Sequence, residues 1–316
     1  MNDIISSFSL ASEVVVPLVI YMCIGWLVRR LKILSREQMT AFNLLIFKLM
    51  IPLSLFFNVY QVELGDAVSP KLFLYAFLGV ILFSAVTWMI MGRVARDPAD
   101  RATLTQGSFR SNFVLFGGII AAQLCQEQGI AMVGAMTAII VPTINILSVI
   151  VFEQARGGKV TIARIIKEAL KNPLVIAGFL GLLVSALHLR LPSLFMDPLR
   201  NLGNAATPVA LVLLGGILSA ESIRSHIREL SIAVVLRLIL IPLTAVSIGV
   251  FLGFRGDYLV ALVAVFASPT AVASAPMAQV MGGNGPLASE IVAATSVCSV
   301  VTIFLFIYLL SWFHLI

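Results

Sequence analysis

The chain has 316 residues, of which 60% are apolar and 11% are charged, with a formal net charge of +6. Soluble globular domains carry about 25% charged residues, so this composition excludes an ordinary soluble domain. Long, continuous apolar runs instead predict membrane-spanning helices, each of which needs about 20 mostly apolar residues. A nucleic-acid partner is not expected, because the basic residues lie between apolar runs, where they set membrane topology.

Ten apolar segments follow one another along the chain, joined by loops too short to hold a soluble domain. Continuous apolar runs favour helices over a barrel, whose strands would alternate in polarity. We therefore expect an all-α polytopic membrane protein with ten transmembrane helices. No cleavable signal peptide is expected, because acidic Asp3 and Glu13 lie near the start of the chain, where a basic region would be needed. The predicted spans are approximately 11–28, 41–60, 72–92, 103–124, 130–152, 172–189, 203–220, 231–252, 258–280 and 287–311.

Lys and Arg residues are concentrated in alternate loops, and this bias predicts the orientation. Loops rich in Lys and Arg remain in the cytoplasm. The basic loops follow the first, third, fifth and seventh spans, so both termini are expected on the extracytoplasmic side. The other loops contain only Lys71, Arg190, Arg200 and Arg255. The basic loops contain Arg29, Arg30, Lys32, Arg36, Arg93, Arg96, Arg101, Arg156, Lys159, Arg164, Lys167, Lys171, Arg224 and Arg228.

The two halves of the chain are expected to be repeats offset by 156 residues, with the first repeat at 1–156 and the second at 157–316. Matching residues align the first span with the sixth, the second with the seventh and the fourth with the ninth. Five spans per repeat is an odd number, so the second repeat must enter the membrane inverted. The matching pairs are Pro17 and Pro173 (173 − 17 = 156), Gly25 and Gly181, Pro52 and Pro208, Gln123 and Gln279, and Gly129 and Gly285.

The fourth and ninth spans have unusual residues near their middles. Proline removes a backbone donor, and paired glycine loosens a helix. The fourth span contains Asn112 and then Gly117-Gly118, and the ninth contains Pro269. Asn112 aligns with Ser268 in the repeat (268 − 112 = 156). Since interrupted backbone is tolerated in a membrane only where it is buried or lines a cavity, we expect two broken helices that cross at a site.

The second half of each broken helix would begin near the bilayer midplane, so two helix N-termini would face each other. An N-terminus carries about half a positive charge and free N–H groups, which together favour an anion. The alternative interpretation is that the same residues only form kinks and small-residue packing faces. The candidate substrate-binding residues are Asn112, Ser111, Arg110, Gly117, Gly118, Asn145, Ser268, Pro269, Thr270 and Ser274.

Charged residues inside the spans are few. Lys48 and Arg237 are expected to extend to the membrane interface, whereas Arg110 lies beside the predicted break and could either do the same or attract a carboxylate. The only acidic candidates, Glu153 and Glu290, lie at span ends, so no carboxylate pair suggests a proton relay. No HExxH, GxSxG or P-loop pattern occurs, and we expect no enzyme activity, no cofactor and no metal.

Several stretches resemble the auxin efflux carrier family, which includes plant PIN-type carriers and bacterial malonate or malate permease-like proteins. The family belongs to the bile/arsenite/riboflavin transporter-like superfamily. Asn112 matches the family's asparagine at the first break and Pro269 its proline at the second, but Ile119 stands where the family usually has proline. The resemblance covers nearly the whole chain, and the stretches that carry it are 43–52, 172–174 with Gly181, 202–215, 236–242 and 268–283.

The resemblance implies ten helices in two inverted repeats, a homodimer and an elevator-like motion. It implies a scaffold of approximately 11–60 and 172–220, and a transport part of approximately 72–152 and 231–311. The central loop, about 154–171, is short, which favours a bacterial-type member in the inner membrane.

We therefore expect a secondary transporter of a small organic anion, with a carboxylate as its substrate. A sodium-coupled symporter of the bile-acid type and a membrane sensor that binds a ligand without moving it are the alternatives.

Overall fold

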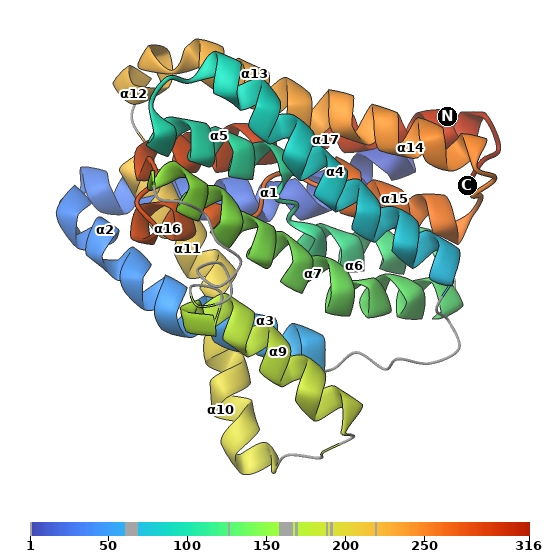
Figure 1. Cartoon of the computed structure of the whole chain (residues 1–316), viewed down its shortest axis with the longest axis horizontal. Coiled ribbons are helices and arrows are strands. Elements are labelled where there is room, and N and C mark those ends of the chain that lie inside the picture. Colours follow the sequence, from blue (N-terminus) through green and yellow to red (C-terminus); the bar gives the residue numbers. More distant parts are fainter. Residues whose placement is uncertain are drawn as a thin grey trace.

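The computed structural model describes residues 2–60, 69–125, 127–157, 167, 170–187, 189, 192–218 and 220–316. Helices dominate these residues, and the only β-type pairing among them is one bridge between Ser111 and Thr270 (Figure 1). Three basic residues of the topology prediction, Lys159, Arg164 and Arg190, lie outside the described residues.

The first part of the chain forms α1 (Asn2–Arg30), α2 (Arg36–Leu45), η1 (Ile46–Met50), α3 (Ile51–Tyr60), α4 (Pro70–Val94), α5 (Pro98–Phe109), α6 (Phe113–Leu124) and α7 (Glu127–Ala155). The second part forms α9 (Pro173–Ala186), α10 (Ser193–Asn204), α11 (Ala206–Ile217), α12 (Ala220–Ser225), α13 (Ile227–Val235), η2 (Leu236–Leu240), α14 (Ile241–Phe251), α15 (Asp257–Ala267), α16 (Ser274–Val280) and α17 (Gly285–Trp312).

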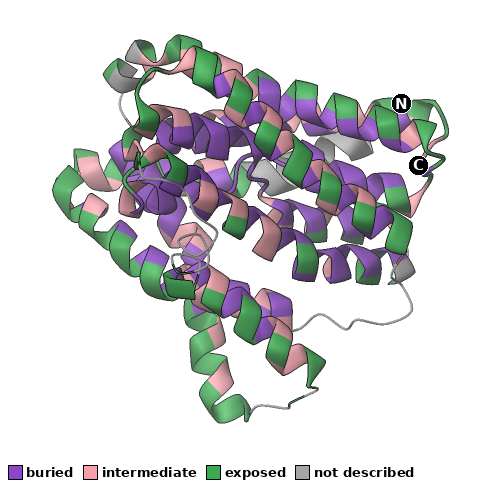
Figure 2. Cartoon of the chain, in the orientation of Figure 1, coloured by how far each residue is buried: buried purple, intermediate pink, exposed green. Residues whose placement is uncertain are grey.

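The helices are long and apolar enough for a polytopic membrane protein, as the sequence predicted. Three shorter apolar helices, α6, α9 and α15, accompany the long ones. On α4, Leu74, Leu78 and Leu82 recur every four residues and are all more than half exposed. Such an apolar stripe on the outside of the molecule suits lipid rather than water (Figure 2). Five stretches among the described residues meet the criteria for a span: Arg36–Tyr60, Pro70–Val94, Gly129–Ala155, Ile227–Phe251 and Gly285–Trp312.

Two of these spans contain a π-helical turn, and a proline explains each one. In η1, the N–H of Ile51 donates to the carbonyl of Ile46, and in η2 the N–H of Ile241 donates to the carbonyl of Leu236. Pro52 and Pro242 follow directly. Because proline has no N–H and its ring displaces the carbonyl four residues earlier, the chain widens by one residue and then resumes as an α-helix.

Two other spans are interrupted, as predicted. Arg110, Ser111 and Asn112 separate α5 from α6, and residues 268–273 separate α15 from α16. The prediction that the glycine pair takes part in the first break is wrong, because Gly117 and Gly118 lie within α6. The predicted seventh span differs too, since it divides at Ala205 and is preceded by α10.

Helix α1 packs closely on α11, and small residues allow the approach. A Cβ on Gly25 would overlap the backbone carbonyl of Val212, and a Cβ on Gly215 would overlap that of Met22. In a membrane, where lipid is as apolar as leucine, such close backbone contact supplies much of the attraction between helices. Helix α3 packs on α9 beside this pair, and α10 continues from α9 along α3 (Figure 1).

We predict that Gly215→Ala destabilises the protein by about 1–3 kcal/mol, because the added methyl group forces α1 away from α11. Thermal unfolding of the purified protein in detergent measures the change. Gly134→Ala in α7 is the matched control, because nothing lies within 4 Å of a Cβ at Gly134. Equal stability of the two variants would contradict close α1–α11 packing.

Candidate functional site

The two breaks pair with each other and so satisfy their exposed backbone groups. The N–H of Asn112 donates to the carbonyl of Pro269 over 2.8 Å, and the N–H of Ala271 donates to the carbonyl of Arg110 over 3.0 Å. These bonds flank the antiparallel bridge between Ser111 and Thr270. An unpaired backbone group in the bilayer costs several kcal/mol, so this crossover is what makes two broken helices tolerable inside a membrane.

Side chains complete the crossover. Thr270 donates its hydroxyl to the carbonyl of Gly107 over 2.6 Å, and its N–H donates to Thr295 Oγ1 on α17 over 3.1 Å. Ser268 donates its hydroxyl back to the carbonyl of Ala264 over 2.5 Å. Ser268 and Thr270 are fully buried, and their polar groups have protein partners, so both residues hold the crossover together.

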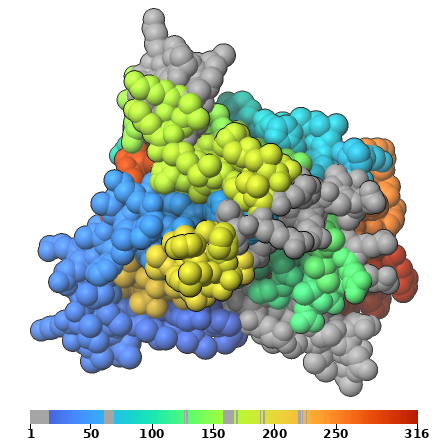
Figure 3. All heavy atoms as spheres, turned by 90° about the horizontal axis from the view of Figure 1, so that it is seen from below, coloured from blue at the N-terminus to red at the C-terminus, as the bar shows by residue number. Residues whose placement is uncertain are grey.

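A cavity of about 610 Å³ adjoins the crossover. Small-molecule sites commonly have volumes of about 300–1,000 Å³, so this space suits one small ligand. Its wall includes the first break and α6 on one side and α1, α3 and α11 on the other, with contributions from α7, α9, α10 and residues 271–273. Figure 3 shows the face on which α10, in yellow, lies beside the blue surface of the N-terminal helices.

Four polar side chains at the crossover end of this cavity each have a buried atom that finds no hydrogen-bond partner among the described residues. Arg110 Nε, Ser111 Oγ and Asn112 Nδ2 come from the first break, and Asn145 Oδ1 comes from α7. All four residues line the cavity. A buried polar atom normally has a partner, and leaving it without one costs about 1–3 kcal/mol. Three of these atoms can donate a hydrogen bond, so the group fits a ligand rich in acceptors.

Arg110 supplies positive charge to this group. Its side chain is 4% exposed, and Nη1 donates to Ser148 Oγ over 3.2 Å and to Met277 Sδ over 2.8 Å. These neutral partners do not balance the charge of a guanidinium. Arg110 is the one charged residue among the described residues that line the cavity. Asn112 is also the N-cap residue of α6, so the positive end of that helix dipole adds to the same region.

The structure divides the predicted site residues into two groups. Arg110, Ser111, Asn112, Gly118 and Asn145 line the cavity. The others are not among its lining residues. Ser268, Pro269 and Thr270 form the crossover backbone, Ser274 begins α16, and Gly117 lies against the ring of Phe113 on the inner face of α6. The second break instead contributes residues 271–273 to the wall.

Polar residues on the opposite wall were not predicted as site residues. Ser54 and Asn58 on α3 are joined by a hydrogen bond of 3.4 Å from Asn58 Nδ2 to Ser54 Oγ, and Asn204 and Thr207 lie near the α10–α11 junction. Each is a polar residue within an apolar span, which the sequence reveals. Only their common position on one wall of the cavity indicates a site.

The prediction for Arg237 is wrong, whereas that for Lys48 stays a prediction. Lys48 is exposed on η1. Arg237 on η2 is only 1% exposed and does not reach an interface. The physical reason is that backbone carbonyls at both breaks accept its hydrogen bonds, so the guanidinium is solvated by protein instead of water.

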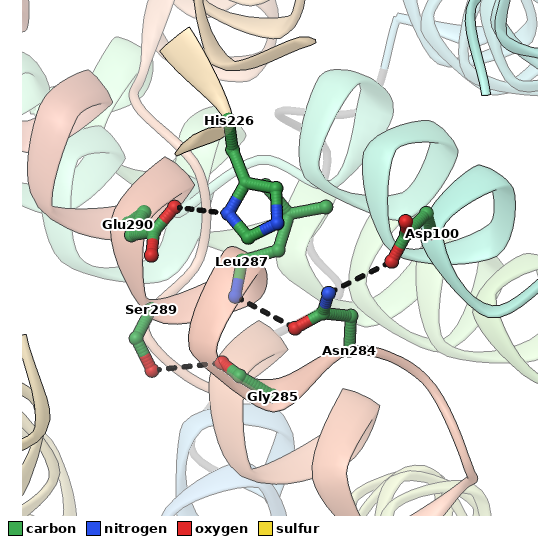
Figure 4. A network of polar contacts seen from close by, with 7 residues as sticks. All are labelled: Asp100, His226, Asn284, Gly285, Leu287, Ser289 and Glu290. Atoms are coloured by element: carbon green, nitrogen blue, oxygen red, sulfur yellow. Dashed lines mark hydrogen bonds and ion pairs between the residues drawn. The ribbon is translucent and has the colours of Figure 1, made fainter. Parts of the chain in front are cut away.

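A second polar network lies away from the cavity, at the start of α17 (Figure 4). His226 Nδ1 is 3.2 Å from Glu290 Oε2, and Asn284 Nδ2 donates to Asp100 Oδ1 over 2.8 Å. Asn284 also caps α17, because its Oδ1 accepts from the N–H of Leu287. The network therefore ties α5 and α13 to α17. Among the described residues, no group of His, Cys, Asp and Glu side chains is arranged to hold a metal ion.

Comparisons with known proteins agree with a membrane protein. A model of the membrane transport protein family matches residues 10–307. A protein described as an uncharacterized transporter, from Methanothermobacter thermautotrophicus, is 23% identical over 297 residues, which cover 93% of this chain and 96% of that protein. The family match extends across both breaks and every wall of the cavity. The chain therefore belongs to the membrane transport protein family of the auxin efflux carriers.

Proposed function

We propose that this transporter is a secondary carrier of a small organic anion and that the cavity beside the crossover is its substrate site. The observation that carries the proposal is the buried Nε of Arg110, which has no partner, beside the unpaired Nδ2 of Asn112. A carboxylate accepts several hydrogen bonds and forms charge-assisted bonds with guanidinium groups. Bound there, it would satisfy both donors and balance the charge of Arg110.

The proposal includes ten membrane crossings in two inverted repeats, 1–156 and 157–316, with both termini outside the cytoplasm. Equivalent contacts support it. Gly25 lies against the carbonyl of Val212, and Gly181 lies 2.9 Å from the carbonyl of Phe56, measured from an ideal Cβ. The two glycines are 156 residues apart (181 − 25), and the two residues whose carbonyls they contact are also 156 residues apart (212 − 56). If the two halves are repeats, a contact between them is expected twice, with the two contacting positions exchanged between the halves.

Alternating access is the mechanism that this arrangement favours. The cavity separates α6 from α3 and α11, whereas at the other end of the molecule α16 is joined to α2. There Asn43 Nδ2 donates to Gln279 Oε1 over 2.8 Å, and Gln279 Nε2 donates to the carbonyl of Thr40 over 2.9 Å. We propose a scaffold of about 11–60 and 172–220, past which a transport part of about 72–152 and 231–311 moves as an elevator.

We predict counterflow of a carboxylate by the purified protein in proteoliposomes. A panel of radiolabelled mono- and dicarboxylates, each tested with sodium and with sodium replaced by choline, measures it. Transport that continues without sodium is expected, because no cluster of acidic ligands lies among the described cavity residues. Strict dependence on sodium would favour a symporter of the bile-acid type instead. Specific binding of a carboxylate without any flux would favour a sensor and contradict a carrier.

We predict that Asn112→Ala lowers transport, as Vmax/KM, by about 10- to 100-fold, because a hydrogen bond to a charged group contributes about 1.5–3 kcal/mol. Asn112→Asp should reduce it further, since the new carboxylate repels an anion. Membrane abundance should be unchanged in both. Asn201→Ala, at an exposed asparagine of α10, is the control. Wild-type transport by Asn112→Ala would remove Asn112 from the site.

We predict two mutually exclusive crosslinks in a background without Cys23, Cys125 and Cys298. Cysteines at Asn43 and Gln279 should crosslink in the state described by the structure. The repeat-equivalent positions, Leu199 and Gln123 (43 + 156 and 279 − 156), should crosslink only after the cavity closes.

Each crosslink should stop transport, and reduction should restore it. Single-cysteine variants control for modification alone. Normal transport with the first pair fully crosslinked would rule out movement of α16 past α2.

A further inference from the structure

We propose that Arg237 is the positioning residue of the crossover, which fixes the two breaks relative to each other so that Arg110 and Asn112 face the substrate. The inference rests on the proposed substrate site. Arg237 lies on η2 and does not line the cavity. It is among the largest fully buried side chains of the protein. Any effect on substrate must therefore pass through the groups that it contacts.

All of the hydrogen bonds of Arg237 go to backbone carbonyls at the breaks. Nε and Nη2 donate to the carbonyl of Ser268 over 2.8 and 2.5 Å, and Nη2 also donates to the carbonyl of Val265 over 3.3 Å. Nη1 donates to the carbonyl of Phe109 over 3.1 Å. One planar guanidinium therefore bonds the ends of both α5 and α15. Lysine, with a single ammonium group on a flexible stem, could not reproduce this forked arrangement of donors.

The break itself creates the need for these donors. In a continuous helix, the carbonyl of Val265 would accept from the N–H four residues later, but that residue is Pro269, which has none. The carbonyl of Phe109 is likewise one of the last carbonyls of α5, which have no partner within the helix. Both helix ends also carry about half a negative charge. A guanidinium between them supplies the missing donors and balances the two dipoles.

Two of the three acceptor carbonyls occupy equivalent positions in the two halves of the chain, but the donor has no equivalent. Phe109 and Val265 are related by the offset of 156 (265 − 109), so Arg237 bonds the same atom in each half. The position equivalent to Arg237 is Ile81 (237 − 156), which cannot donate. Arg237 therefore adds one shared group of donors to the backbone bonds that already join the two breaks. Since Phe109 precedes Arg110 directly, a shift there would move the cationic side chain of the cavity.

The test compares Arg237→Gln and Arg237→Lys with Arg29→Gln in proteoliposomes. Arg29 is the matched control, because its Nη1 donates to the carbonyls of Gly216 and Leu218 at the end of α11, away from the crossover. Arg237→Gln is expected to raise the KM for the carboxylate by about tenfold or more, since misplacement of binding groups by about 1 Å can cost up to 100-fold. Arg237→Lys should give a smaller rise. Arg29→Gln should lower the melting temperature and leave KM within about twofold of wild type.

A second readout does not depend on transport. Cysteines at Ser111 and Thr270, which face each other across the bridge, should form a disulfide rapidly with a membrane-permeant oxidant, because directly opposite residues of this kind have Cα atoms about 4.5–5.5 Å apart. Arg237→Gln should slow this reaction at least about tenfold. If no carboxylate is transported by the wild type, the proposed function fails, but the crosslink still tests the positioning role.

Wild-type KM and crosslinking rate in a folded Arg237→Gln variant would overturn the proposal, because Arg237 would then only add stability. If Arg237→Gln does not fold, Arg237→Lys is the deciding variant. A wild-type KM together with a wild-type crosslinking rate in Arg237→Lys would show that a guanidinium bonded to both breaks is not required, and would overturn the proposal.

Discussion

The hydrocarbon interior allows no backbone N–H or C=O to remain without a partner, and the crossover of the two broken helices meets this constraint. Each break supplies the partners that the other lacks, through the bonds between Asn112 and Pro269 and between Ala271 and Arg110. Because of this pairing, irregular backbone can lie in the interior of the molecule, where side chains at the first break reach a cavity. The two breaks, and the proposed substrate site beside them, therefore depend on one small antiparallel bridge.

Charge at the crossover follows from the direction of the helices. The C-terminal ends of α5 and α15 are electronegative and receive Arg237, whereas the N-terminal end of α6 is electropositive and lies beside Arg110. Arg237 thus donates four hydrogen bonds to backbone carbonyls, whereas the buried Nε of Arg110 has no hydrogen-bond partner among the described residues. Burial of a cation is expensive unless it is paired. This difference supports the structural role proposed for Arg237 and the anion-binding role proposed for Arg110.

The two ends of the molecule differ in a way that suits a carrier. Close to the crossover, α6 stands apart from the helices opposite it and leaves a cavity, whereas α16 is hydrogen-bonded to α2 through Asn43 and Gln279. The chain belongs to the membrane transport protein family, so we relate this difference between its two ends to transport. A repeat-related exchange of the two arrangements would move the cavity from one end to the other without changing the fold of either half.

The sequence by itself determined the all-helical membrane fold, the positions of the five stretches long and apolar enough to span and the two breaks, because apolar length and proline are local signals. It also identified Asn112 and Arg110 correctly as neighbours of a break. Only the tertiary structure decided that Gly117 and Gly118 stay helical, that Ser54 and Asn204 share the cavity wall opposite the crossover and that Arg237 turns inward. These outcomes depend on which carbonyls and side chains, distant in the sequence, come into contact across the bundle. A local sequence pattern does not predict such contacts.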